Sequence, residues 1–347
     1  MFYKKILRPI LFLLNPETIH KITFILFRFF PVFGYMFGFR NRRITNQRIA
    51  PVSLMGLNFK NPVGLAGGLD KNARALRFMK NMGFSFVEIG TVTPLAQKGN
   101  SKPRLFRLSR NQALINRMGF NNDGVEVICR RLRKRPRGLI VGGNIGKNSS
   151  TPNINAVEDF VICFEKLYPF VDYFTVNVSC PNIKDLSKLQ NKTDLERIIT
   201  RLMNSRAGMV VKKPILLKIS PDLSVNQLDE VVEVILGTHI DGVIATNTTT
   251  GRFNLDYSEN EIARYGEGGL SGFPLCQISS DVIRYLRHRL GSELPIIGSG
   301  GVMSASDAQD KMDAGANLVQ LYTGFIYEGP GLLTQILKSC QPPAWRN

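Results

Sequence analysis

Eight short apolar segments, spaced at helix-sized intervals, constrain the fold of this chain more than any other feature. Each has Gly, Asn, Thr or Ser among its last two residues, and helix-like sequence separates it from the next. Such alternation predicts a parallel sheet, and eight repeats predict a (β/α)8 or TIM barrel of the α/β class. The segments cover residues 62–68, 86–92, 139–146, 173–180, 214–220, 242–248, 294–301 and 318–324.

Polar residues gather at the ends of these predicted strands. Ser224 and Ser304 are suited to begin two of the helices between them, and Gly315 to end the second. In a barrel the strand ends meet at one mouth, where burial of so many polar groups without partners would be costly. We therefore expect a ligand site there. The residues are Lys71, Thr91, Asn144, Asn177, Cys180, Lys218, Asn247, Thr248, Tyr322 and Thr323.

Several motifs indicate what such a site binds. The glycine-rich turns at 298–301 and 322–324 follow the last two strands, where barrels commonly hold phosphate. Asn116, Asn177, Asn182 and Asn247 offer amide donors and acceptors that suit a small planar ligand, although each alone is typical of a turn. Lys218 is suited to stabilise an anionic ring or to pair with a neighbouring carboxylate.

The five cysteines are scattered and include no CxxC pair, which argues against a disulfide framework or a zinc site. They are Cys129, Cys163, Cys180, Cys276 and Cys340. We expect a reducing compartment and no metal. Cys180, directly before a proline, is either a buried filler or a reactive thiol beside a ligand.

Positive charge is concentrated in two places. The chain has a net charge of +18; its first 50 residues hold nine Lys or Arg against one acid, Glu17, and a second run, RRLRKRPR, covers 130–137. This balance favours an anionic partner, whether a lipid surface, a nucleic acid or an anionic substrate. The run at 130–137 is also typical of the solvated end of a helix.

The apolar N-terminal region predicts two short helices rather than a membrane span. The stretch at 22–39 is interrupted by Arg28, Pro31 and Gly34, no signal-peptide cleavage site follows, and NPET at 15–18 predicts a new helix start. We expect these helices to lie in a membrane surface, with a small self-packed helical domain as the alternative.

Motifs along essentially the whole chain closely resemble the dihydroorotate dehydrogenase family. They are NPVGLAGGLDKN, EIGTVTP, GNSKPRLFRL, INRMGFNNDG, NIGKN, DGVIATNTT, GGLSG, IIGSGG and LVQLYTGFIYEGP. The N-terminal extension with NPETIH resembles the quinone-dependent class 2 enzymes and is absent from soluble class 1 enzymes. The resemblance implies oxidation of (S)-dihydroorotate to orotate in de novo pyrimidine biosynthesis, with one FMN and a membrane quinone as final electron acceptor.

The resemblance also implies site residues. FMN would contact Gly67, Gly68, Lys71, Thr91, Asn144, Asn177, Lys218, Thr246, Gly272, Gly301, Tyr322 and Thr323. Orotate or dihydroorotate would contact Lys71, Asn116, Arg117, Met118, Gly119, Phe120, Asn177, Asn182, Asn247 and Thr248. A quinone path would be lined by His20, Arg107 and Tyr322.

The position of the catalytic base departs from the class 2 pattern. Class 2 members usually have SSPNTxGL, whereas this chain has SCPNIKDL at 179–186, so that Cys180 stands for serine and Ile183 for threonine. The implied general base is thus a class 1-like cysteine. We expect nearby cations such as Lys71 to lower the pKa of its thiol.

The resemblance divides the chain into residues 1–45, a membrane-associating and quinone-channel segment, and residues 46–347, the FMN-binding barrel. We expect a monomeric peripheral protein on an anionic membrane surface, at the cytoplasmic side of the cell membrane or in the inner mitochondrial membrane, with no nucleic acid partner. The alternatives are another FMN barrel reductase acting on a pyrimidine or tRNA uridine, a class 1-type enzyme using fumarate or NAD, and a non-enzymatic basic protein.

Overall fold

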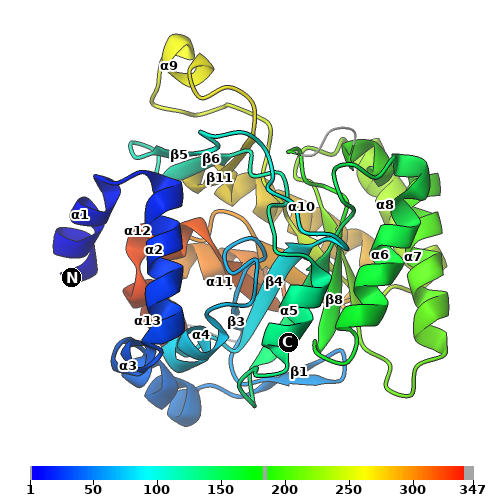
Figure 1. The fold of residues 1–347 in the computed structure, drawn as a ribbon, viewed down its shortest axis with the longest axis horizontal. Helices are drawn as coiled ribbons and strands as arrows, with labels where there is room; N and C mark the ends of the chain where they lie inside the picture. Colours follow the sequence, from blue (N-terminus) through cyan, green and yellow to red (C-terminus); the bar gives the residue numbers. More distant parts are fainter. Residues whose placement is uncertain (1, 183–185, 340–347) are drawn as a thin grey trace.

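The predicted barrel is confirmed. The computed structural model describes residues 2–182 and 186–339 (Figure 1), and eight parallel strands close into a barrel in the order β3-β4-β7-β8-β9-β10-β12-β13. The strands are β3 (Val63–Leu65), β4 (Phe86–Val92), β7 (Ile140–Ile145), β8 (Tyr173–Asn177), β9 (Ile215–Ile219), β10 (Gly242–Ala245), β12 (Ile296–Ser299) and β13 (Leu318–Leu321).

Helices cover the outside of the barrel. They are α4 (Leu76–Met82), α5 (Val125–Leu132), α6 (Ala156–Leu167), α7 (Lys192–Ala207), α8 (Val225–Thr238), α10 (Cys276–Leu290), α11 (Ala305–Asp313), α12 (Thr323–Glu328) and α13 (Pro330–Ser339). The predicted starts are confirmed, because the Ser224 and Ser304 side chains accept hydrogen bonds from backbone N–H groups in the first turns of α8 and α11. Gly315, with φ +122°, lies just beyond the end of α11.

The barrel interior changes from apolar to polar along the strands. Its lower layer is a cluster of fully buried side chains that includes Phe86, Tyr173, Leu216 and Leu318. Two residues further along the same strands stand Glu88, Thr175, Lys218 and Gln320, all buried. Because side chains alternate across a strand, both sets point inward. The polar layer lies toward the carboxyl ends of the strands.

Smaller elements close the two mouths. The hairpin of β1 (Val52–Leu54) and β2 (Leu57–Phe59) packs on the lower apolar layer. At the other mouth, β5 (Leu105–Leu108), β6 (Ala113–Asn116) and β11 (Gly269–Gly272) form an antiparallel sheet. A lobe carrying α9 (Glu259–Ala263) projects beyond this sheet (Figure 1). The strand-like patterns of these short segments were not recognised in the sequence.

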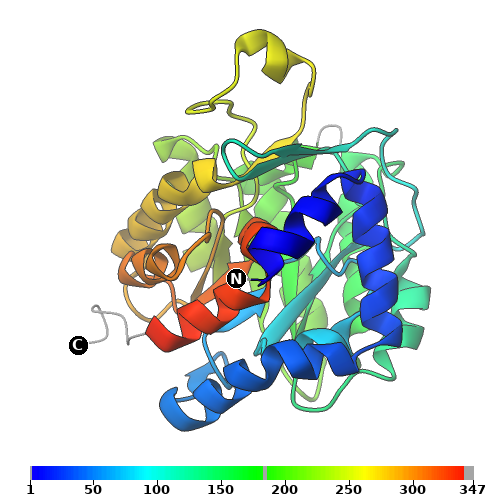
Figure 2. The ribbon, with the colours of Figure 1, turned by 90° about the vertical axis from the view of Figure 1, so that its left-hand side faces the viewer.

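The N-terminal segment is helical and wraps one side of the barrel, as Figure 2 shows. It comprises a π-helical turn η1 (Tyr3–Leu7), α1 (Arg8–Phe12), α2 (Pro16–Phe29) and α3 (Val32–Arg48). The break predicted from NPET is confirmed, since Asn15 caps α2. Among the described residues no single helix is long and apolar enough to cross a bilayer, but α2 and the first part of α3, bent by 85°, pass that test as a pair. The division into two domains near residue 45 stays a prediction.

A buried ion pair ties this segment to the barrel. The Arg104 guanidinium donates to both carboxylate oxygens of Glu17, from Nε at 3.1 Å and from Nη2 at 2.8 Å. Both side chains are less than a tenth exposed. Arg104 also donates to the backbone oxygens of Lys98 and Asn100, so its donors are used on two sides. Removing either partner would leave an uncompensated buried charge, which typically costs about 3–5 kcal/mol.

Two glycines allow α3 to lie directly on α4. A Cβ at Gly34 would meet the Phe78 backbone oxygen at 2.6 Å, and one at Gly38 would meet the Asn81 oxygen at 1.9 Å. Neither neighbour is a flexible side-chain end. The close approach therefore requires glycine at both positions.

Gly38→Ala is expected to lower the free energy of unfolding by about 1–3 kcal/mol, because the added methyl forces two backbones apart. Gly237→Ala is the matched control: a Cβ there meets nothing within 4 Å, and alanine is the better helix former inside α8. Thermal and urea unfolding of both variants tests this. Equal stability of the two would contradict the close packing of α3.

Candidate active site

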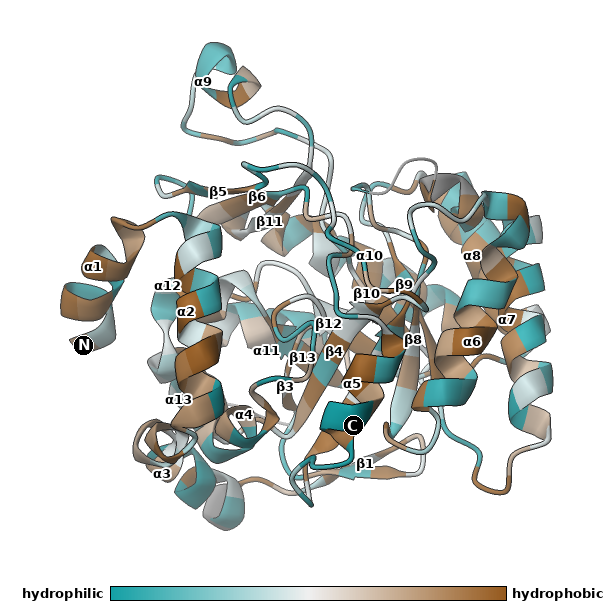
Figure 3. Cartoon of the chain, in the orientation of Figure 1, coloured by the Kyte–Doolittle hydropathy of each residue, from teal (hydrophilic) through white to brown (hydrophobic). Residues whose placement is uncertain are grey.

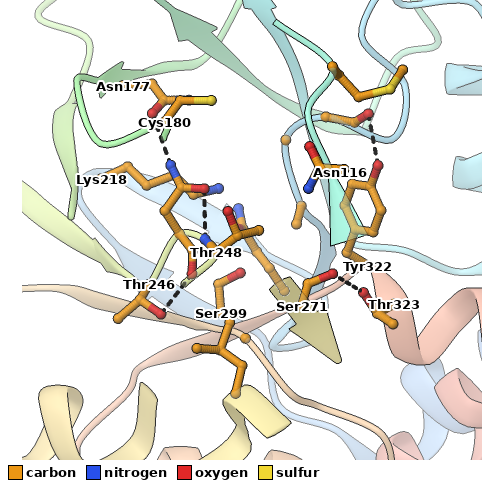
Figure 4. A pocket seen from close by; sticks show the side chains of 18 of the residues that line it. Asn116, Asn177, Cys180, Lys218, Thr246, Thr248, Ser271, Ser299, Tyr322 and Thr323 are labelled. Carbon is orange, nitrogen blue, oxygen red and sulfur yellow. Dashed lines mark hydrogen bonds between the residues drawn. The ribbon is translucent and has the colours of Figure 1, made fainter. Parts of the chain in front are cut away.

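A cavity lies at the carboxyl ends of the strands, beneath the β5-β6-β11 sheet. The space between its walls, including the part open to solvent, is about 940 Å³. Figure 4 shows side chains from many strands converging on it. Of the residues that the sequence predicted for the site, it is lined by Gly67, Gly68, Lys71, Thr91, Asn116, Met118, Gly119, Phe120, Asn177, Cys180, Asn182, Lys218, Thr246, Asn247, Thr248, Gly272, Gly301, Tyr322 and Thr323.

Two predicted contacts lie off the cavity wall. Asn144 is buried behind it, where its Oδ1 accepts from Thr91 at 2.5 Å. The Arg117 guanidinium turns away, stacks on the Phe106 ring at 4.7 Å and donates to the backbone oxygens of Tyr265 and Glu267. Arg117 therefore braces the loop after α9, and Asn144 orients a residue of the wall.

Glu88, which the sequence analysis missed, organises the floor of the cavity. Its carboxylate accepts hydrogen bonds from Asn144 Nδ2 at 2.7 Å, Thr175 Oγ1 at 3.0 Å and Gln320 Nε2 at 3.0 Å. Lys218 Nζ lies 3.7 Å from Glu88 Oε1, and both side chains are buried. The sequence left open whether Lys218 pairs with a neighbouring carboxylate or faces a ligand. In the structure it pairs with Glu88 and also lines the cavity. The sequence signal that could have revealed this role is a glutamate within an otherwise apolar predicted strand.

Two glycines of the cavity wall lie too close to other protein atoms to carry a side chain, and an unpaired acceptor nearby suits a polar ligand. A Cβ at Gly67 would meet Glu88 Oε1 at 2.5 Å, and one at Gly301, with φ +72°, would meet the Cys276 backbone at 2.3 Å. Gln320 Oε1 is buried without a hydrogen-bond partner among the described residues. A ring N–H would satisfy such an acceptor, which is otherwise costly to bury.

Asparagine side chains hydrogen-bond to one another in two pairs along the wall. Asn247 Nδ2 donates to Asn177 Oδ1 at 3.2 Å, and Asn182 Nδ2 donates to Asn116 Oδ1 at 3.0 Å. Asn182 Oδ1 is buried and, within the described parts of the chain, accepts no hydrogen bond. The wall therefore retains amide capacity for a small ring with donors and acceptors on its edge.

The cavity favours an anion. Lys71 and Lys218 line it, whereas no Asp or Glu is among the described residues of its wall. Lys71 Nζ donates to the Gly68 oxygen at 2.6 Å. Burial lowers the pKa of Lys71 to about 8, with a further lowering by Arg104, so the side chain remains mostly protonated at neutral pH. A carboxylate or phosphate would offset this charge.

Cys180 lies in the wall, and its sulfur points into the cavity (Figure 4). The nearby cations lower the pKa of this thiol as expected, but burial outweighs them. Burial raises the pKa to about 11; hydrogen bonds from Asn182 and the charges of Lys218 and Lys71 lower it, but by less than burial raises it. The replacement of threonine by Ile183 lies outside the described residues.

The predicted quinone-path residues do not share one cavity. Tyr322 lines the cavity and donates from its hydroxyl to the Gly68 oxygen at 3.3 Å. His20, on α2, contacts the neighbouring Leu69 oxygen through Nε2 at 3.0 Å, and burial lowers its pKa to about 4. Arg107, on β5, donates to the Phe12 and Leu14 oxygens. His20 and Tyr322 thus bind consecutive carbonyls of one loop.

Comparison with known proteins identifies the family. The family model described as dihydroorotate dehydrogenase matches residues 49–341. The chain belongs to the dihydroorotate dehydrogenase family. Curated relatives named "Dihydroorotate dehydrogenase (quinone)" include one from Christiangramia forsetii, 48% identical over 96% of this chain and 97% of the relative, and one from Nitrosomonas eutropha, 44% identical over 95% of each.

Solved structures agree with this assignment. A dihydroorotate dehydrogenase from Eimeria tenella, solved in complex with ferulenol, superposes with a TM-score of 0.81 at 33% identity, covering 94% of this chain and 90% of that one. The predicted family, its quinone type and the barrel fold are thereby confirmed. The comparisons do not favour the alternative reductases. The roles of individual site residues stay predictions.

Alkylation of Cys180 by iodoacetamide is expected to be slow at pH 7 and to accelerate without a plateau up to pH 9.5, because only the thiolate reacts. A free cysteine, with a pKa near 8.5, levels off within that range. Peptide mass spectrometry of the ligand-free protein measures the rate. Cys163, which is fully buried, is the internal control for an intact fold and should stay unmodified. A plateau for Cys180 below pH 8 would show that the lysines outweigh burial.

Proposed function

We propose that the chain oxidises dihydroorotate to orotate in pyrimidine biosynthesis, with FMN as hydride acceptor and a membrane quinone as final electron acceptor. The observation that carries the proposal is the convergence of Cys180, Lys71 and four asparagine amides on one cavity in a member of this family. The names of the curated relatives support the quinone as acceptor.

The residues present fit a flavin mononucleotide. The unpaired Gln320 acceptor would suit an N–H group of a flavin ring. The glycines after β12 and the start of α12 offer backbone N–H groups for a phosphate. Lys218 supplies positive charge beside the ring. When bound, the flavin would supply the redox chemistry, as acceptor of the hydride from C6 of the substrate and as donor of two electrons to a quinone.

The substrate is held by charge at one end and amides at the other. Lys71, protonated at neutral pH, pairs with the carboxylate of dihydroorotate. The Asn182 acceptor and the Asn116 and Asn247 side chains bind the ring edge. These contacts orient the C5–H bond of the substrate toward the Cys180 sulfur.

Cys180 takes the C5 proton as the general base. Its raised pKa makes the thiolate a strong base but a scarce one at neutral pH. The two lysines and Asn182 increase the fraction of Cys180 that is ionised, since each stabilises the thiolate. The rate of proton removal at saturating substrate should therefore rise as the pH is raised from 6 to 9.

The N-terminal helices provide the route for the quinone. Many large apolar side chains of this segment are exposed, which suits peripheral attachment to a membrane where quinones reside. His20 links α2 to the loop at the cavity edge. With a pKa near 4 it is neutral at physiological pH and adds no charge to an apolar path.

Cys180→Ala is expected to slow flavin reduction by about 10²–10⁴-fold, the usual contribution of a general base, while flavin remains bound. Anaerobic stopped-flow absorbance of the flavin after mixing with dihydroorotate measures this. Cys129→Ala removes a buried thiol outside the cavity and should reduce at the wild-type rate. Wild-type speed in Cys180→Ala would remove the base from the mechanism.

The reduced enzyme should be reoxidised by a short-chain ubiquinone or menaquinone analogue, and not by fumarate or NAD⁺. Uracil derivatives and tRNA should exchange no electrons with the flavin. Recovery of the flavin absorbance after each addition under anaerobic conditions reports the outcome. Reoxidation by fumarate or NAD⁺ alone would instead assign the class 1-type activity.

A further inference from the structure

The basic run at 130–137 lies beside the bend between α2 and α3, although some 100 residues separate them in sequence. A groove on this face, here called the elbow groove, is formed by three segments. The bend contributes apolar side chains, and α4 and the loop after α5 contribute cations. Its lining consists of Pro31, Val32, Tyr35, Arg77, Lys80, Asn81, Arg135, Pro136 and Arg137.

The elbow groove is a fixed feature. Asn81 Nδ2 donates to the Pro31 oxygen at 2.9 Å and so fastens the bend to α4. Arg42 donates to the Asn81 oxygen and lies over the Tyr35 ring at 4.1 Å. The glycine contacts of α3 on α4 hold the same geometry. The cations therefore face the bend in a set arrangement.

Three of the four cations that line the groove lack a carboxylate partner among the described residues. Arg135 is paired with Asp172 through two bonds of 2.7 and 2.8 Å, which positions the loop. Arg77, Lys80 and Arg137 make no ion pair with any carboxylate of the described residues. Arg130, Arg133 and Lys134, in the same run, are exposed and add to the positive field.

Exposed aromatic and aliphatic side chains lie on α2 and α3, the two helices that meet at the bend. Phe29 and Phe39 are each 66% exposed, Met36 is 70% exposed, and Phe33 and Phe37 are nearly half exposed. Figure 3 shows hydrophobic residues over α1 and much of α2 as well. Aromatic side chains next to Lys and Arg are typical of a surface that sits at the headgroup level of a bilayer.

We propose that the elbow groove binds the phosphate-bearing headgroup of an anionic phospholipid while the exposed aromatic side chains of α2 and α3 enter the interface. The site rests on the proposed membrane attachment and adds to it a preference for anionic lipid. A soluble polyanion would need only the cations for binding and would leave the exposed apolar side chains of α2 and α3 in water. The combination of the two favours a lipid.

The test is partition of the flavin-loaded full chain onto vesicles. Wild-type protein should bind vesicles with 30 mol% phosphatidylglycerol more tightly than pure phosphatidylcholine vesicles. The triple variant Arg77→Gln, Lys80→Gln, Arg137→Gln should lose about fivefold per cation, on the order of a hundredfold in all, on anionic vesicles only. Its binding to neutral vesicles should stay within about twofold of wild type.

The matched control removes three cations elsewhere that make no ion pair with a carboxylate of the described residues. Arg201→Gln, Lys212→Gln and Arg264→Gln lie on α7, just after it and just after α9, and should leave the partition within about threefold of wild type. An equal loss of binding to anionic vesicles in both triple variants would contradict the groove as the binding site and would indicate that diffuse surface charge drives the binding. A loss of oligonucleotide binding without any change in vesicle binding would assign the groove to nucleic acid and overturn it too.

Flavin reduction by dihydroorotate, measured on the same samples, separates this site from the catalytic function. None of the six residues lines the cavity, so reduction should be normal in both triple variants. Equal binding of wild type to neutral and anionic vesicles would refute the headgroup site and leave membrane attachment standing. Absence of binding to either would refute both.

Discussion

The polar half of the barrel depends on the carboxylate of Glu88. It lies at full burial in the barrel interior, and Asn144, Thr175, Gln320 and Lys218 are arranged around it. A buried carboxylate must be matched by donors and positive charge, so the residues above the apolar layer are constrained in identity and direction. The floor of the cavity is thus set by one charge inside the barrel.

The same burial that shapes the cavity governs its acid–base chemistry. Removal from water lowers the pKa of Lys71 and raises that of Cys180, so both groups move toward their neutral forms. Each partly offsets the shift of the other, because a lysine charge favours a thiolate. A substrate carboxylate next to Lys71 enters this balance as a third charge. The protonation states of Lys71 and Cys180 therefore depend on each other and on the charge of the bound substrate.

The sequence predicted the barrel, its eight strands and most of the cavity wall, because strand ends such as those carrying Asn177 and Thr323 must meet at one mouth. It did not predict the Glu88 network, since a glutamate within FVEIGTV gives no sign of which face it takes until the barrel closes. It also did not predict that burial raises the pKa of the Cys180 thiol overall. Motif and charge pattern place a thiol near lysines, but the extent of its burial is a property of the packed molecule.

The N-terminal segment finds its partners at the other end of the chain. Tyr3, Lys4 and Arg8 bind Ile326, Glu328 and Tyr327 of α12, and Asn41 accepts from Thr334 of α13. During synthesis the first helices leave the ribosome long before these partners exist. The contacts with α12 and α13 thus form last, whereas those of α3 with α4 can form early. The N-terminal segment can therefore complete its packing only after the C-terminal helices have been synthesised.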